Sequence, residues 1–171
     1  TTRGASNIVL APLTFSLPVQ SVAQPEIAAV AAPLGGGPAV VAAVLESLAC
    51  AERLPDPEMH VVIVAPASEA AVIPALRDEC AQEDGHGWGS LSVVVMASER
   101  APAVAAVQAM RERLGRVLLV PLSVAPGPYV AHVSSVAQAG GVDHTTQTLH
   151  ATEALTKLLL SRVCSARRPP A

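Results

Sequence analysis

Short apolar runs along the chain predict β-strands. The clearest is 60–65, an almost unbroken series of valine and isoleucine that is typical of a strand buried on both faces of a parallel sheet. Valine makes up half of the run at 91–96, and the run at 117–122 consists of leucine and valine around Pro121. The full set of predicted strands is 7–13, 27–32, 60–65, 91–96, 117–122 and 142–148.

Between these runs, apolar positions follow the spacing of three and four residues that amphipathic helices have. In the segment 38–53, Val41, Val44 and Leu48 share one face. Pro38 suits the first turn of that helix, because the N–H group that it lacks would have no helical partner there. Helices are predicted over 38–53, 68–82, 101–113, 130–138 and 151–163.

One pattern occurs twice in the chain. Residues 8–17 read Ile-Val-Leu-Ala-Pro-Leu-Thr-Phe-Ser-Leu, and residues 117–126 read Val-Leu-Leu-Val-Pro-Leu-Ser-Val-Ala-Pro, so Pro12 aligns with Pro121. In both places a second apolar strand and an apolar helix follow. An internal repeat of this kind predicts two copies of one α/β unit.

The two copies differ in completeness. From residue 58 onward, strands and helices alternate, which predicts a complete α/β unit with an open, mainly parallel sheet flanked by helices. The earlier residues supply only the back half of such a unit, with a short helix between its two strands. We expect the missing strand and helix upstream of Thr1, and a shortened loop or absent residues near 20–24. The predicted divisions are 1–56 for the incomplete first repeat, 57–165 for the second repeat and 166–171 for a tail.

Composition and charge narrow the classes of function. Of the 171 residues 51% are apolar but only 2% are aromatic, so the core is built from Ala, Val and Leu. The net charge is −3 without a basic stripe, which argues against nucleic-acid binding, because that binding needs clustered Lys and Arg. No apolar run reaches the ~18 residues of a membrane-spanning helix.

The cysteines indicate a reducing compartment. Cys50, Cys80 and Cys164 are widely spaced and form no Cys-x-x-Cys pair. We interpret them as small, buried apolar groups. Reduced thiols of this kind predict a cytoplasmic protein.

Several elements occur in an order that is found in a known family. A proline-started helix at Ser98-Glu99-Arg100-Ala101-Pro102 precedes the strand Arg116-Val117-Leu118-Leu119-Val120-Pro121-Leu122, and Pro126-Gly127 follows. In the first repeat, Ala32-Pro33-Leu34-Gly35 precedes the last helix. This pattern, which spans nearly the whole chain, resembles the class II chelatases, the CbiX and SirB type proteins of cobalamin and sirohaem biosynthesis.

The resemblance implies both a fold and a reaction. It implies a two-lobed, chelatase-like tandem repeat that binds a tetrapyrrole in the cleft between its lobes. The implied reaction is that of a lyase, in which Co²⁺ or Fe²⁺, as a substrate, enters sirohydrochlorin without an organic cofactor. The expected partner is the tetrapyrrole, not a nucleic acid or a membrane, and a homodimer is left open. A non-catalytic tetrapyrrole- or metal-binding member is the alternative, and a pure interaction domain is a less favoured one.

The chain departs from the family pattern where the family has histidines. The family's first strand ends in His-Gly-Ser, and here the same place reads Pro66-Ala67-Ser68. A second family histidine, after the Pro-Leu element, is replaced by Tyr129, and His132 lies three residues further on. The glutamate that closes the family's second strand segment aligns with Ser98, beside Glu99.

Metal insertion requires a ligand that presents the metal and a base that removes the pyrrole N–H protons. Histidine can do both at neutral pH, because its pKa is about 6.5 and imidazole suits Fe, Co and Ni. We therefore predict His132 as the metal ligand, and His132 and Glu99 as the catalytic residues. The predicted substrate-binding residues are Ser68, Tyr129, Gly127, Gly36 and His150.

Each of these assignments has a simpler alternative. Gly36 lies in a run of three glycines before a helix, where free N–H groups bind anions, but a plain tight turn is the alternative. For His132 and His150 the alternative is an exposed residue at a helix. His60 precedes a strand at the amino edge, His86 lies in a glycine-rich loop and His144 begins a strand, so none of these three is predicted to take part in the chemistry.

Overall fold

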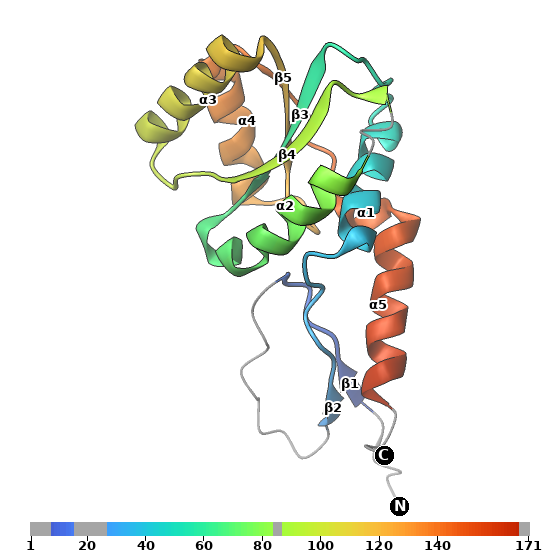
Figure 1. Cartoon of the computed structure of the whole chain (residues 1–171). Coiled ribbons are helices and arrows are strands. Elements are labelled where there is room, and N and C mark those ends of the chain that lie inside the picture. The colour runs from blue at the N-terminus through green and yellow to red at the C-terminus, as the bar shows by residue number, and fades with distance from the viewer. Residues whose placement is uncertain (1–7, 16–26, 84–86, 168–171) are drawn as a thin grey trace, which may run out of the picture.

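Two parallel sheets form the framework of the chain (Figure 1). The structure is a computed structural model and describes residues 8–15, 27–83 and 87–167. The strands are β1 (Ile8–Leu10), β2 (Ile27–Val30), β3 (Met59–Ala65), β4 (Ser90–Val95), β5 (Arg116–Pro121) and β6 (Asp143–His144). The helices are α1 (Pro38–Cys50), α2 (Ile73–Gln82), α3 (Arg100–Leu114), α4 (Pro128–Gly140) and α5 (Glu153–Ala166), with 3₁₀ helices η1 (Ala67–Val72) and η3 (Leu149–Ala151).

The larger sheet has the strand order β4-β3-β5-β6, and all of its neighbouring strands are parallel. Strand β3 pairs with β4 on one side and with β5 on the other, and every residue from Val61 to Ala65 is buried. The carboxyl ends of these strands therefore meet at one edge, which is where open α/β sheets bind ligands. The smaller sheet pairs β1 with β2, also in parallel.

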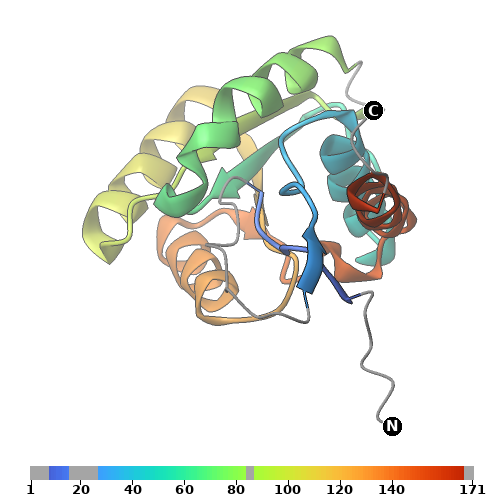
Figure 2. The same cartoon turned by 90° about the horizontal axis from the view of Figure 1, so that it is seen from below.

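Alternation along β3 sends its side chains to two separate cores. Val61 and Ile63 join a cluster with α1, α2 and the start of α5, and Val62 and Val64 join a second cluster with α3 and α4. Figure 2 shows α1 and α5 on the side of the sheet opposite to α4. Helix α1, which lies within the predicted first repeat, thus completes the core on one face of the large sheet. In turn α5 extends along the small sheet (Figure 1).

The repeat reappears as a matched pair of backbone hydrogen bonds. In the first copy, the N–H groups of Leu34 and Gly35 donate to the carbonyls of Thr14 and Phe15 (3.0 and 2.9 Å). In the second copy, the N–H groups of residues 149 and 150 donate to the carbonyls of residues 123 and 124 (3.0 Å each). The accepting carbonyls are at positions that align when Pro12 is placed on Pro121, whereas the donors lie six residues further from that proline in the second copy. The division of the chain at residues 56 and 57 stays a prediction.

Most predicted elements are present, and the differences have local causes. The strand predicted over 142–148 is only Asp143–His144, because the Thr145 hydroxyl accepts a hydrogen bond from the N–H of Gln147 and turns the chain. The helix predicted over 68–82 begins as η1, since Pro74 cannot continue an α-helical ladder towards its amino end. The strand predicted over 7–13 ends at Leu10, before Pro12.

The prediction about the cysteines is wrong for two of the three. Cys80 is on the buried face of α2, but Cys50 and Cys164 are exposed. The shortened loop near 20–24, the short first-repeat helix and His86 lie outside the described residues, as does most of the predicted tail. Among the described helices, none has the length and apolar character that a membrane crossing needs.

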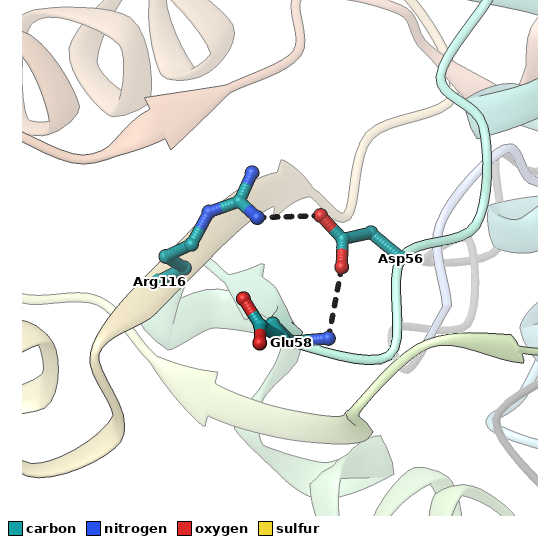
Figure 3. A network of polar contacts seen from close by, with 3 residues as sticks. All are labelled: Asp56, Glu58 and Arg116. Atoms are coloured by element: carbon teal, nitrogen blue, oxygen red, sulfur yellow. Dashed lines mark hydrogen bonds and ion pairs between the residues drawn. The ribbon is translucent and has the colours of Figure 1, made fainter.

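An ion pair ties the segment after α1 to the beginning of β5 (Figure 3). Arg116 Nη1 lies 2.6 Å from Asp56 Oδ2, and the N–H of Glu58 donates to Asp56 Oδ1 at 2.9 Å. These two hydrogen bonds, first that from Glu58 and then that from Arg116, hold the pKa of Asp56 below its ordinary value of 3.8. Asp56 therefore favours the folded state in its ionised form.

We expect the substitution Asp56→Asn to lower the free energy of unfolding at neutral pH. Because the pKa of Asp56 is lower in the folded than in the unfolded chain, the stabilisation is complete above the unfolded value of 3.8 and fades as the pH falls through the folded value. Urea unfolding of both proteins between pH 7 and about pH 2 checks this. Asp143→Asn is the control, since Asp143 has no ion pair among the described residues. A difference that persists unchanged in acid would contradict the assignment.

Candidate functional site

A pocket of about 170 Å³ lies at the carboxyl edge of the large sheet. It is bounded by the segments that follow β3 and β4 and by the first turns of α4. Apolar groups supply most of the wall, and His132 supplies its only imidazole. The lining residues are Pro66, Ala67, Met96, Ala97, Ser98, Tyr129 and His132.

The size of this pocket indicates one wall of a larger site. Pockets that enclose a drug-sized ligand measure roughly 300–1,000 Å³, so a space of about 170 Å³ does not enclose a tetrapyrrole. Pro66, Ala67 and Met96 form an apolar part of its wall. The edge of the sheet thus offers an apolar surface beside a single basic side chain.

His132 is held in a defined orientation. Its Nε2 lies 3.1 Å from the carbonyl oxygen of Ala97, the second residue after β4. A carbonyl can only accept a hydrogen bond, so Nε2 carries the proton and Nδ1 keeps the lone pair. The contact therefore assigns Nδ1 as the atom of His132 that can bind a metal ion or accept a proton.

Tyr129 lies one helical turn before His132 on α4 and lines the same pocket. Its ring packs against the core formed by α3, α4 and the sheet. Its hydroxyl is buried and has no hydrogen-bond partner among the described residues. Burial raises the pKa of Tyr129 far above its ordinary value of 10, so the phenol stays protonated and cannot act as an anionic metal ligand near neutral pH.

The other predicted site residues are not brought into the pocket. Glu99 caps the start of α3 beside Ser98 and is exposed, and Gly127 caps the start of α4 with open space around its Cα. Ser68 is exposed in η1, two residues beyond Pro66. His150 is exposed in η3, where its Nδ1 lies 2.7 Å from Thr148 Oγ1. Their roles stay predictions, since only Tyr129 and His132 share the pocket.

Gly36 is buried, and its surroundings explain why it is a glycine. A Cβ atom at this position would lie 2.7 Å from the carbonyl oxygen of Val72 and 3.2 Å from the Leu76 side chain. The backbone before α1 thus packs directly on the junction of η1 and α2. The contact with Val72 gives Gly36 a role in packing. Its role in binding substrate stays a prediction.

Two wall residues escaped the sequence reasoning. Met96 and Ala97 directly follow β4, and Ala97 contributes a backbone carbonyl that no motif marks. The usable signal was their position at the end of a predicted strand, because parallel strands bring their carboxyl ends together.

A larger pocket of about 350 Å³ lies at the opposite, amino edge of the sheet. Arg111 and Arg116 line it, but Arg116 is paired with Asp56, and Arg111 Nη1 lies 3.5 Å from the carbonyl of Gly140 at the end of α4. Cationic side chains at the carboxyl ends of helices are expected from the helix dipole alone. We therefore place the candidate site at the carboxyl edge.

No protein-family model and no curated protein matches this sequence. Solved structures match its fold. SirB from Bacillus subtilis, in a structure with Fe³⁺, is 12% identical and has a TM-score of 0.66 over 95% of this chain and 72% of its own. CbiX, described as the terminal enzyme for biosynthesis of sirohaem in denitrifying bacteria, is 15% identical, with a TM-score of 0.59 over 94% of this chain and 76% of its own.

A third similar structure is DR2241 from Deinococcus radiodurans, a multi-domain protein described as structurally similar to chelatases with two additional domains. It is 15% identical and has a TM-score of 0.61 over 82% of this chain. This chain spans 32% of its length, about a third.

The chain has a class II chelatase-like fold. The three structural likenesses confirm the mixed α/β architecture of parallel sheets flanked by helices that the sequence predicts. They concern the fold, since the identities are 12% to 15%. Within this chelatase-like fold, the carboxyl edge of the second sheet carries the pocket with His132 and Tyr129.

We expect Gly36→Ala to destabilise the chelatase-like fold by about 1–3 kcal/mol, because the new methyl group would overlap the Val72 carbonyl. Gly37→Ala is the matched control: no heavy atom lies within 4 Å of a Cβ there, so the cost stays below about 1 kcal/mol. Urea unfolding of the two variants measures the difference. Equal stability of both would show that the backbone before α1 is free to move away from η1.

Proposed function

We propose that this chain is a sirohydrochlorin chelatase-like protein that presents Co²⁺ or Fe²⁺ to a tetrapyrrole at the carboxyl edge of its second sheet. The observation that carries the proposal is the pocket in which an oriented imidazole stands beside an apolar wall. The chelatase-like fold supports it, since SirB with Fe³⁺ and CbiX share this architecture. In this proposal the protein acts in the cytoplasm, and the metal is a substrate that needs no organic cofactor beside it.

The residues would divide the work as follows. Pro66, Ala67 and Met96 would support the face of the macrocycle, and the lone pair of His132 Nδ1 would serve the metal or the pyrrole N–H group. A neutral imidazole can hold a divalent metal weakly and can also accept a proton from a pyrrole N–H group. The exposed carboxylate of Glu99, next to pocket residue Ser98, can pass that proton to solvent.

The small number of metal-binding side chains at the pocket also favours a second candidate function. No group of three or more His, Cys, Asp or Glu side chains converges in the described part of the chain, so metal delivery relies on His132 alone. Pro66 and Tyr129 occupy the places where the resembled family has histidines. A non-catalytic protein that binds the tetrapyrrole would need only the apolar wall and the polar rim.

Metal insertion can be followed directly by absorbance. We expect purified protein to accelerate the spectral change of sirohydrochlorin on adding Co²⁺ above its spontaneous rate, and His132→Gln to reduce that acceleration by about 100-fold, because it removes the proton acceptor. His60→Gln is the control. Its imidazole lies at the amino edge, where Nδ1 is 2.7 Å from Ser90 Oγ, and glutamine can keep that hydrogen bond.

The outcomes separate the two functions. Acceleration by the unmodified protein and by His60→Gln, but not by His132→Gln, supports the chelatase. Binding of sirohydrochlorin without any acceleration supports the non-catalytic alternative. If the protein neither accelerates the reaction nor binds the tetrapyrrole, both functions are excluded.

A further inference from the structure

The Tyr129 hydroxyl is a buried polar group without a hydrogen bond to any described residue. The ring of Tyr129 lines the pocket at the carboxyl edge. Leaving a buried hydroxyl unpaired costs about 1–3 kcal/mol, and such groups are uncommon in folded proteins. Phenylalanine would fill the same space in the core of α3 and α4 without that cost.

The position of the hydroxyl suggests what compensates for its cost. Tyr129 is in the first turn of α4, two residues after Gly127, where an added Cβ would have no heavy atom within 4 Å. One turn later, the Nε2–H group of His132 donates to the Ala97 carbonyl. Tyr129 is then the side chain of α4 at the pocket whose donor group has no described partner. An acceptor that arrives with a ligand would give the phenol its first partner.

We infer that the Tyr129 hydroxyl donates a hydrogen bond to a carboxylate of the tetrapyrrole bound at this edge. The inference rests on the proposed function and assigns Tyr129 a role in specificity rather than in metal chemistry. The phenol remains protonated because burial raises its pKa, so it donates a proton to the hydrogen bond throughout the neutral range. A carboxylate is the strongest acceptor that the proposed substrate carries, since a charged acceptor roughly doubles the strength of the bond.

Binding would then change the environment of Tyr129. Since its hydroxyl has almost no contact with solvent in the free protein, the ring must shift for the oxygen to reach a ligand. The same hydrogen bond therefore contributes to affinity but not to the stability of the free protein. Removing a hydroxyl that binds ligand should lower the affinity and raise the stability of the free protein, whereas removing a hydroxyl with a structural role should lower the stability.

The variant Tyr129→Phe tests the inference, and Ser134→Ala is its matched control. Ser134, on the same helix, also has a buried hydroxyl without a described partner, but it does not line the pocket. We expect both variants to raise the urea midpoint of the free protein. Only Tyr129→Phe should weaken the binding of metal-free sirohydrochlorin, by about tenfold or more, because the lost hydrogen bond has a charged acceptor. Fluorescence titration of the tetrapyrrole measures both affinities.

Each outcome has a distinct meaning. Equal affinities of the unmodified protein and Tyr129→Phe for sirohydrochlorin would overturn the inference and leave the proposed function intact. No binding by the unmodified protein would overturn both. The difference between the two proteins should shrink for the methyl ester of sirohydrochlorin, whose oxygens are weaker acceptors. If it does not shrink, a carboxylate is not the partner of Tyr129.

Discussion

Burial of α1 against the large sheet is the interaction on which the rest of the structure depends. The helix lies within the predicted first repeat, yet its apolar face is in the core between β3, β5, α2 and the start of α5. Val40, Val41, Val44 and Leu48 are 0–1% exposed, and each contributes about 1.5–3 kcal/mol by leaving water. Without α1, one face of the parallel sheet would be covered only in part, by α2 and the start of α5, which such sheets rarely tolerate. The two repeats are therefore joined by one core as well as by the chain.

This shared core also fixes the carboxyl edge. Gly36, just before α1, packs on the carbonyl of Val72, and η1 leads back to Pro66 at the end of β3. The pocket wall is thus supported from behind by a helix that belongs to the other repeat. On the opposite face, α4 carries Tyr129 and His132 and is anchored through Val133 and Val136. The position of the candidate site follows from these two layers rather than from any one loop.

The fold was more predictable from the sequence than the site was. The apolar runs at 60–65 and 117–122 favour strands buried in a parallel sheet, and Pro38 marks the start of a helix, so these elements follow from local rules. The short β6 did not follow, because its end depends on a side-chain hydrogen bond of Thr145. The positions of α1 on the large sheet and of α5 along the small sheet did not follow from the sequence either. They depend on contacts between residues far apart in the chain, which local periodicity does not encode.

Within the site, a sequence motif can mark a side chain but not a backbone group. Tyr129 and His132 were predicted from their place after the Pro-Leu element, and they do share a pocket. The carbonyl of Ala97, which selects the tautomer of His132, is invisible in the sequence because every residue has a carbonyl. The unpaired state of the Tyr129 hydroxyl is equally a property of the packed structure. Chemical roles were thus assigned from side chains, and their orientation came from the fold.

Under the proposed function, Pro66 and Tyr129 narrow the chemistry of this edge, because they stand at positions where the resembled family has histidines. Proline has no side-chain ligand, and a buried phenol with a raised pKa does not ionise to bind metal near neutral pH. His132 is the one imidazole among the residues that line the pocket, so in the proposed reaction the metal and the proton would use its Nδ1 in succession. In that proposal the tetrapyrrole is held through shape and hydrogen bonds more than through the metal. Affinity for the metal-free macrocycle is therefore the property that the proposed site is best suited to supply, and a single imidazole would limit the proposed rate of metal insertion.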